Sequence, residues 1–289
     1  YRSLFREILR KTRPKVVFFQ GYYENDTFGL TAAAREMNIT VIDIQHGKQG
    51  RFHPMYSHWT RIPRDGYELL PDFFWNWGEE SKEDINRWKN NKEVHVPVVG
   101  GNLWLARWKN GSLYRASEPD KEFLDGLSKA GRVILYTLQP LDKAEVFPRH
   151  VMDAIRNSPA DWVWLLRIHP FQKLDAEEVK KMFEGISSRI ETKFSTSIPL
   201  YHLLQHVHHH LTLWSSTCFE ANEFGVPTTI AHDFGYKLFE GYIKENVFSF
   251  ATDPGEIIRM VKEHKPNRRS GFLETNPDIA REALKRMGI

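Results

Sequence analysis

Short apolar runs alternate with amphipathic segments along most of the chain. In the second half these runs are rich in β-branched and aromatic residues, which is typical of buried strands. The predicted strands there are residues 133–138, 162–168, 189–194, 209–214, 227–231 and 247–251. The predicted helices are residues 146–157, 175–186, 198–207 and 253–264. This alternation predicts βαβ units, and therefore a parallel sheet that is covered on both faces.

The first third of the chain repeats this pattern with fewer segments. The predicted strands are residues 15–20, 40–45, 73–78 and 94–100, and the predicted helix is residues 27–38. Because a complete doubly wound domain has five or six strands, we expect a truncated or reduced Rossmann-like domain here. Near the end of the chain, Asn276 and Pro277 form a typical helix start and predict a terminal helix.

The length of 289 residues favours two domains. We expect a partial N-terminal Rossmann-like domain at residues 1–103 and a C-terminal one at residues 132–270. Residues 104–131 are rich in polar residues and form the predicted linker, and residues 271–289 form the predicted C-terminal helix. The predicted fold class is α/β, with two Rossmann-like domains that face a cleft.

Composition and charge narrow the class of protein. With 41% apolar and 27% charged residues, the chain has the composition of a folded globular protein. The net charge of +3 is too small for the dense positive surface of a nucleic-acid binder, so we expect no nucleic-acid partner. The single cysteine, Cys218, is consistent with a reducing compartment and favours the cytoplasm.

Two further expectations concern the membrane and the chain's start. No apolar run approaches the ~20 residues that span a bilayer, so any membrane contact would be peripheral. No signal peptide is recognised, and the chain opens at Tyr1, without a methionine and inside a segment of helical character. We therefore expect that an upstream segment has been removed.

Candidate chemistry follows the predicted strands. In open α/β sheets, ligands bind beyond the carboxyl ends of the strands, where loops and helix N-termini converge. Five polar segments directly follow a predicted strand: residues 44–50, 137–142, 167–172, 213–220 and 232–237.

Two adjacent serines, Ser215 and Ser216, stand where a predicted strand passes into a helix. Small hydroxyl residues before a helix, together with the free N–H groups of its first turn, favour a phosphate ligand. Thr217 and Glu220 have capping-box spacing, which is a purely structural alternative for this segment. Glu220 could instead accept hydrogen bonds from ribose hydroxyls, and the sequence leaves both alternatives open.

Two histidines follow predicted strands in a similar way. Pro170 restricts the backbone after His169, so the imidazole should leave the edge of the sheet in a fixed direction, where it could stabilise a leaving phosphate. His46 precedes Gly47 and could act as a general base, since its ordinary pKa of about 6.5 lies near working pH. A packed or solvated histidine is the alternative for His169, and a loop histidine without a chemical role is the alternative for His46. We also expect His169 and the serine pair to meet at neighbouring strand tips, where they would hold a single anionic group.

The histidine-rich stretch at residues 201–210 invites a metal interpretation. His202 and His206 have i, i+4 spacing, but no carboxylate or cysteine joins them at ligand spacing. We therefore expect no metal. The chain also lacks the glycine motifs of P-loop, dinucleotide-binding and hydrolase sites, so the sequence favours phosphate binding without a P-loop.

The segments at residues 45–50 ("QHGKQG"), 167–170 ("RIHP") and 213–216 ("LWSS"), followed by "GVP" at 225–227, resemble those of a known group of enzymes. These are the GT-B-fold transferases that build bacterial surface polysaccharides. The similarity is to capsule and lipopolysaccharide sugar transferases with His-Pro and Ser-Ser motifs, including sialic acid and Kdo transferases. Teichoic acid glycerophosphotransferases, with a His-Gly motif, are similar too.

The resemblance implies a role for each candidate residue. The catalytic residues would be His46 and His169. The donor-binding residues would be Gln139, Arg167, His169, Pro170, Ser215, Ser216, Thr217 and Glu220, and the acceptor-side residues Gln45, Gly47 and Lys48. The N-terminal domain would bind the acceptor and the C-terminal domain the nucleotide donor.

The implied function is that of a metal-independent glycosyltransferase without a cofactor. It would move a sugar from a nucleotide donor to a hydroxyl group of a surface polysaccharide or glycolipid. A CMP-sugar such as CMP-Kdo or CMP-sialic acid is the favoured donor, and a UDP-sugar is the alternative. The enzyme would lie in the cytoplasm, with peripheral association at the inner face of the membrane left open. The alternative functions are a nucleotide-sugar epimerase of the same fold and a non-catalytic carbohydrate- or nucleotide-binding module.

Overall fold

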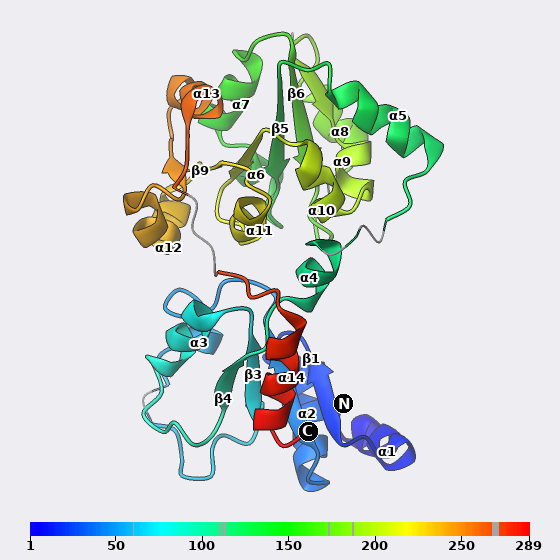
Figure 1. Cartoon of the computed structure of the whole chain (residues 1–289), viewed down its shortest axis with the longest axis vertical. Coiled ribbons are helices and arrows are strands. Elements are labelled where there is room, and N and C mark those ends of the chain that lie inside the picture. The colour runs from blue at the N-terminus through cyan, green and yellow to red at the C-terminus, as the bar shows by residue number, and fades with distance from the viewer. Residues whose placement is uncertain (60, 110, 112–113, 173, 187, 268–271) are drawn as a thin grey trace. The chain divides into compact units, whose positions relative to one another are not determined.

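The computed structural model describes residues 1–59, 61–109, 111, 114–172, 174–186, 188–267 and 272–289. The chain forms two compact units, both shown in Figure 1. Unit 1 contains residues 1–107 and 271–289, and unit 2 contains residues 108–270. The helix α4 (Leu103–Lys109) includes the boundary between them.

Unit 1 is built on a parallel sheet with the strand order β1-β2-β3-β4. Its elements are α1 (Arg2–Thr12), β1 (Val16–Phe19), α2 (Asn25–Glu36), β2 (Thr40–Ile44), the 3-10 helix η1 (Pro54–Tyr56), β3 (Phe73–Asn76), α3 (Glu79–Asn86), β4 (Val96–Val99) and α14 (Pro277–Arg286). Each strand falls within a segment that the apolar pattern predicts. The sheet has four strands, in line with the expectation of a reduced domain.

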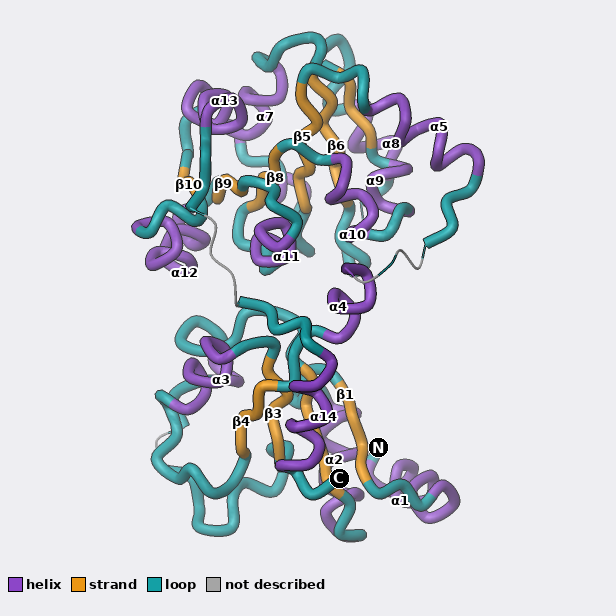
Figure 2. Tube along the Cα trace, in the orientation of Figure 1, coloured by secondary structure: helices purple, strands orange, loops and turns teal. Residues whose placement is uncertain are grey.

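Different helices cover the two faces of the unit 1 sheet, because successive strand residues point to opposite sides. Val41 packs with Ala33 and Ala34 of α2, whereas its neighbour Ile42 packs with Ala283 of α14. Figure 2 shows α14 beside the strands of this unit, although it lies far from them in sequence. The last helix of the chain therefore completes the first unit.

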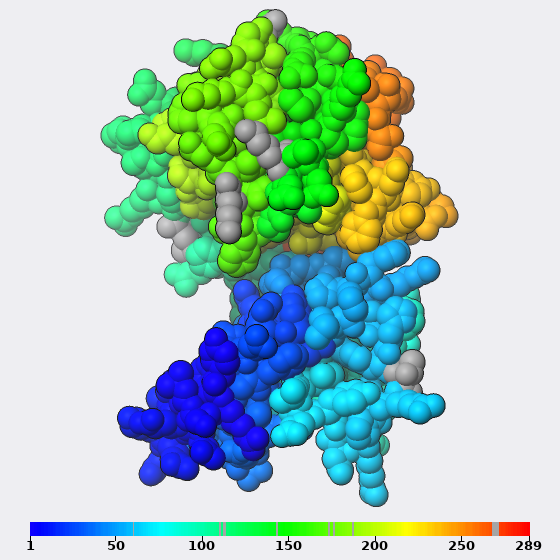
Figure 3. Space-filling view, turned by 180° about the vertical axis from the view of Figure 1, so that it is seen from behind, coloured from blue at the N-terminus to red at the C-terminus, as the bar shows by residue number. Residues whose placement is uncertain are grey.

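Helix α1 packs against α2 and remains largely at the surface (Figure 3, deep blue). Leu9 of α1 is buried in the cluster that includes α2, while Leu4 and Ile8 of the same helix are exposed. Arg2 and Arg6 both form ion pairs with Glu36 at the end of α2. The helix is thus fixed by one apolar stripe and a pair of arginines.

Unit 2 contains a larger parallel sheet, with the order β10-β9-β8-β5-β6-β7. Its elements are α5 (Glu118–Leu127), β5 (Arg132–Thr137), α6 (Lys143–Val146), α7 (Arg149–Arg156), β6 (Trp162–Arg167), α8 (Ala176–Lys181), β7 (Arg189–Glu191), α9 (Lys193–Ser197), α10 (Leu200–Leu203), η2 (Leu204–His206), β8 (His209–Thr212), α11 (Thr217–Glu223), β9 (Thr228–Ile230), α12 (Asp233–Lys244), β10 (Ser249–Phe250) and α13 (Pro254–Glu263). Numbered along the chain from β5, the order is 3-2-1-4-5-6, that of a Rossmann fold. The α/β class with two Rossmann-like units is confirmed.

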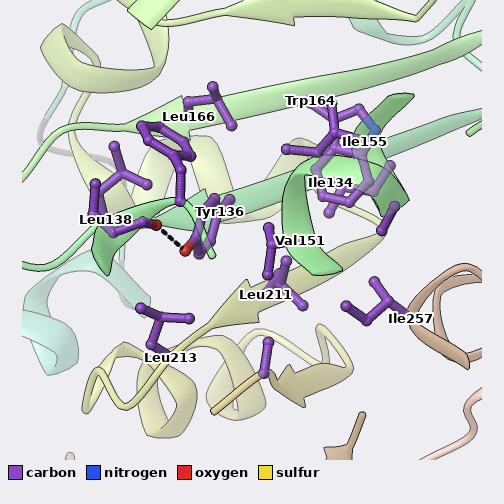
Figure 4. Packing of buried hydrophobic residues seen from close by; sticks show 14 of the residues in the cluster. Ile134, Tyr136, Leu138, Val151, Ile155, Trp164, Leu166, Leu211, Leu213 and Ile257 are labelled. Atoms are coloured by element: carbon purple, nitrogen blue, oxygen red, sulfur yellow. Dashed lines mark hydrogen bonds between the residues drawn. The ribbon is translucent and has the colours of Figure 1, made fainter. Parts of the chain in front are cut away.

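A large apolar cluster of unit 2 joins the sheet to the helices α7, α8 and α13. Side chains from neighbouring strands interdigitate there, as Figure 4 shows for part of the cluster. The labelled residues are Ile134, Tyr136, Leu138, Val151, Ile155, Trp164, Leu166, Leu211, Leu213 and Ile257. Tyr136 is fully buried, and its hydroxyl donates to the carbonyl of Val146 (2.5 Å). The polar atom of this ring is therefore satisfied inside an apolar core.

Two histidines of β8 are part of the sheet interior. His210 contacts the hydroxyls of Thr137 (2.9 Å) and Thr228 (3.1 Å), and burial lowers its pKa to about 3. His209 contacts the hydroxyl of Thr229 (2.8 Å), and burial lowers its pKa as well. Both imidazoles are uncharged at neutral pH, so they hold adjacent strands together as hydrogen-bonding groups.

The region predicted as a linker, 104–131, contains ordered helix. Ser117 caps α5 by accepting from the backbone N–H of Asp120, and Phe123, Leu124 and Leu127 of this helix are buried. The polar composition of the segment reflects an exposed helix face rather than a free linker. The predicted strand at 189–194 also ends earlier, at Glu191, because α9 begins at Lys193.

The first turn of α12 is pressed against the end of β8. A methyl group at Gly235 would lie 1.9 Å from the carbonyl oxygen of Leu213, whereas one at Gly241, on the same helix, would meet no atom within 4 Å. We expect Gly235→Ala to lower the free energy of unfolding by about 1–3 kcal/mol, since the helix must move. The control Gly241→Ala should raise it by about 0.5–1 kcal/mol. Equal urea midpoints for the two variants would contradict this packing.

Candidate functional site

The carboxyl edge of the unit 2 sheet has a switch point between β5 and β8. Parallel strands place their carboxyl ends on one edge, and the chain crosses to opposite sides of the sheet after these two strands. Gln139, which is buried just after β5, accepts a hydrogen bond at Oε1 from the backbone N–H of Trp214 (3.1 Å). The side chain predicted to bind the donor therefore joins the two loops that border the switch point.

The serine pair lies on the loop between β8 and α11. Ser215 Oγ donates to Thr217 Oγ1 (3.0 Å) and accepts from the Thr217 backbone N–H (3.3 Å). Ser216 is the N-cap residue of α11, and its side chain makes no capping hydrogen bond. The structural alternative, a capping box of Thr217 and Glu220, is not formed, because Ser216 is the N-cap and the helix begins one residue earlier than that pattern requires. The serine and threonine hydroxyls are half-buried and lie at the edge where a ligand would enter.

Glu220 belongs to a small polar network behind the serine loop. The Tyr201 hydroxyl donates to Glu220 Oε1 (2.6 Å). Burial raises the pKa of Glu220, while the Tyr201 hydrogen bond and the nearby positive charge of Arg167 oppose that rise. Arg167 donates through Nη1 to the carbonyls of Ser195 (2.6 Å) and Ile198 (2.7 Å), so its guanidinium holds the segment after β7 in place.

His169 is half-buried just beyond β6. Its Nδ1 accepts a hydrogen bond from the backbone N–H of Phe171 (3.2 Å), so the neutral ring must carry its proton on Nε2. Partial burial lowers the pKa of His169 below its usual value. Pro170 is exposed and the Phe171 side chain is 83% exposed, which leaves the edge around the imidazole open to a ligand. At neutral pH the side chain is an uncharged donor.

His169 and the serine pair lie on the same edge, but not on neighbouring strands. Strand β5 lies between β6 and β8. Two strand spacings separate the strand ends by about 10 Å, with Gln139 in the loop between them. The expectation that His169, Ser215 and Ser216 meet at adjacent strand tips is wrong, because β5 occupies the middle of the sheet.

The acceptor-side residues lie after β2 of unit 1. Gln45 is buried; its amide donates to the carbonyl of Gly47 (2.9 Å) and to the Ser81 hydroxyl (2.9 Å), and accepts from the N–H of Trp77 (2.7 Å). These contacts make Gln45 a support for the loop. In this loop Gly50 has a positive φ of 96°, whereas Gly47 does not have a positive φ.

Lys48 is tied to helix α3. Its Nζ lies 2.6 Å from Asp84 Oδ2 and 3.5 Å from Glu80 Oε1, and the side chain is mostly covered. The ammonium group therefore neutralises two carboxylates of unit 1 in this structure. Of the loop's predicted site residues, His46 is the one whose side chain is exposed.

His46 lies within a cluster that the sequence pattern did not reveal. Its Nε2 is 3.4 Å from the Tyr23 hydroxyl, and the ring of Tyr23 packs against His53, with ring centroids 5.2 Å apart. Behind them, the buried Asp43 accepts from the Tyr56 hydroxyl (2.7 Å). The available signal was the segment at residues 21–25 ("GYYEN"), just beyond β1. In a parallel sheet, polar side chains at the carboxyl end of one strand lie near those that follow the neighbouring strand.

The histidines of residues 201–210 do not form a metal site in the described part of the chain. His202 and His206 lie close together, with ring centroids 5.7 Å apart, while His209 and His210 bond to threonines of the sheet. Among the residues that the structure describes, no group of three or more His, Cys, Asp or Glu side chains is arranged to hold a metal ion. No helix in the described part of the chain is both long and apolar enough to cross a membrane.

The fold of this chain is found in solved structures. A UDP-GlcNAc 2-epimerase from Methanocaldococcus jannaschii, in complex with UDP-GlcNAc and UDP, matches with a TM-score of 0.67 at 17% identity, over 100% of this chain and 80% of that chain. The fold is GT-B. Staphylococcus aureus MnaA with UDP matches with a TM-score of 0.63 at 14% identity, over 99% and 78% of the two chains.

A second class of enzyme shares this fold. The glycotransferase of kitacinnamycin matches with a TM-score of 0.53 at 14% identity, over 99% of this chain and 74% of that chain. No family model matches the chain, and no curated protein matches it. At these identities the likeness establishes the GT-B architecture, and the specific resemblance to capsule and lipopolysaccharide enzymes remains a prediction.

The hydrogen bond from Phe171 to His169 predicts a definite tautomer. Above pH 7 the ¹⁵N spectrum of His169 should show a protonated Nε2 and an unprotonated Nδ1, with a titration midpoint below the usual 6.5. The resonance can be assigned by its loss in His169→Asn. An Nδ1-protonated ring would contradict the described geometry.

Proposed function

We propose that this GT-B protein is an enzyme that acts on a nucleotide-sugar, with the nucleotide held at the carboxyl edge of unit 2. The observation that supports this most is the switch point between β5 and β8. Hydroxyls of Ser215 and Ser216, the Nε2–H of His169 and the carboxylate of Glu220 gather along this edge. Donors to phosphate and an acceptor for sugar hydroxyls are the groups that a nucleotide-sugar requires.

The donor we favour is a UDP-sugar, in place of the CMP-sugar that the sequence motifs favoured. Two of the solved structures described above hold such ligands: UDP-GlcNAc and UDP in one, and UDP in the other. The separation of His169 from the serine pair by a whole strand also supports this choice. A diphosphate can reach donors on both β6 and β8, whereas a single phosphate reaches less far.

Each edge residue has a separate task in this proposal. Ser215, Ser216 and Thr217 donate to one phosphate of the diphosphate. His169 donates to the phosphate that leaves with the nucleotide and stabilises its growing negative charge. Glu220, fixed by Tyr201, accepts from the ribose hydroxyls.

The reaction we propose is epimerisation of the sugar, because several of the solved structures of this fold are UDP-GlcNAc 2-epimerases. Glycosyl transfer to a glycan or glycolipid hydroxyl is the second candidate, supported by the kitacinnamycin glycotransferase and by the His-Pro and Ser-Ser motifs. The two reactions differ in one requirement: epimerisation needs the nucleotide-sugar alone, and transfer needs an acceptor.

UDP should raise the melting temperature of the protein more than CMP does, because a ligand that binds the folded state stabilises it. Ser216→Ala and Glu220→Gln should each raise the Kd for UDP about 10-fold or more in calorimetry, since each removes a hydrogen bond, charged in the second case. Ser128→Ala, whose hydroxyl bonds to the Asp125 carbonyl at the exposed end of α5, is the matched control. Equal shifts by CMP and UDP would refute the uridine assignment.

Incubation with UDP-GlcNAc alone decides between the two reactions. We expect ¹H NMR to show a second nucleotide-sugar that differs in configuration at the sugar, with no free UDP accumulating in proportion to it. His169→Ala should slow this conversion by 10²-fold or more. An unchanged sugar, together with UDP release that depends on an added glycan, would reject epimerisation and support transfer.

A further inference from the structure

Tyr23 and His46 form a pair at the carboxyl edge of unit 1. The backbone of Gly21 has φ of 69°, which turns the chain sharply after β1 and brings Tyr23 over the loop that follows β2. A Cβ atom placed on Gly21 would lie 3.7 Å from Tyr23 Cζ and 3.9 Å from His46 Cε1. The Tyr23 hydroxyl and Nε2 of His46 are 3.4 Å apart, a distance that can shorten when a substrate binds.

The ring of Tyr23 is held on several sides. Its centroid is 5.2 Å from that of His53, 5.6 Å from that of Tyr22 and 5.9 Å from that of Tyr56. The rings of Tyr22 and Tyr56 are fully buried and pack edge-on against each other and against Phe74. The buried aromatic rings therefore hold the hydroxyl of Tyr23 in a fixed position, as a proton transfer requires.

Asp43 holds this aromatic cluster together. It is fully buried, and its two carboxylate oxygens accept from the backbone N–H of Gly21 (3.0 Å) and from the Tyr56 hydroxyl (2.7 Å). These contacts fix the turn that carries Tyr23. Asp43 itself is screened from solvent, so we assign it and Tyr56 as positioning residues.

We propose that Tyr23 and His46 act as a proton relay in the sugar reaction, with Tyr23 facing the substrate. A proton leaves the substrate for Oη of Tyr23 while the Tyr23 hydroxyl proton passes to Nε2 of His46. Tyr23 stays neutral, His46 becomes an imidazolium and the substrate gains one negative charge, so protons and charge balance. The reverse transfer returns the proton. The relay rests on the proposed function and names the residues that would serve it in unit 1.

The charge states in this cluster suit such a relay. Burial raises the pKa of Tyr23, with the nearby charges of Asp43 and Glu24 adding to the rise, so the phenol keeps its proton. Desolvation lowers the pKa of His46, so its ring is free to accept one. Burial and then the charge of His46 lower the pKa of His53, and burial raises the pKa of Asp43 to about 7. The other groups that face the pair are the phenols of Tyr22 and Tyr56.

The pairing can be tested without any substrate. An O–H group that donates to Nε2 stabilises the neutral imidazole, so Tyr23→Phe should raise the NMR pKa of His46. Tyr67→Phe is the matched control, because that exposed hydroxyl donates to the carbonyl of Arg61, outside the cluster. An unchanged His46 pKa in Tyr23→Phe would overturn the pairing, whatever the enzyme's reaction.

Kinetics then test the role in the reaction. Tyr23→Phe and His46→Asn should each lower kcat with UDP-GlcNAc by about 10²-fold or more, with KM within a few-fold, and Tyr67→Phe should match the wild type. Asp43→Asn should lower kcat and remove a pH-dependent step near pH 7. Full activity of Tyr23→Phe would overturn the relay and leave the proposed function intact. A wild-type protein that turns over no nucleotide-sugar, alone or with a glycan, would overturn the proposed function and with it the relay's role.

Discussion

The hydrogen bond between the amide of Gln139 and the backbone of Trp214 ties together two loops that leave the sheet on opposite sides. Without it, the switch point would be bordered by independent loops, and a ligand would have to pay for ordering them. The sheet beneath is also cross-linked: Thr137 and His210 bond across β5 and β8 through side chains that are almost completely buried. The carboxyl edge of the unit 2 sheet is therefore a preformed surface for a ligand.

Desolvation by neighbouring side chains has the same effect on the candidate chemistry of both units. It lowers the pKa values of His169 and His46, which are therefore mainly uncharged at neutral pH, and it raises the pKa of the Tyr23 phenol, which stays protonated. Neutral groups with fixed hydrogen-bonding directions can accept or donate protons without first losing a tightly held hydration shell. Two charged side chains near the candidate sites, Lys48 and Arg167, instead hold loops in place.

The sequence predicts the strands of both sheets well, because buried parallel strands are continuous apolar runs between polar loops. It also predicts that Ser215, Ser216 and His169 lie at carboxyl edges, since each directly follows such a run. Strand order is a tertiary property, so the separation of His169 from the serines by β5 could not be predicted. The same holds for Asp43 and Tyr23, whose partners are brought to them by the turn at Gly21.

Helix α5 could not be predicted from composition. Its exposed face makes the segment polar, while Phe123 and Leu127 are buried beneath it. The position of α14 has a different kind of consequence. Ile42, Trp75 and Val98 are made early during synthesis on the ribosome, but the helix that covers them, α14, follows all of unit 2 along the chain. One apolar face of the first sheet must stay uncovered while the second unit is made. The nascent protein at that stage is a natural client for a chaperone that shields apolar surfaces.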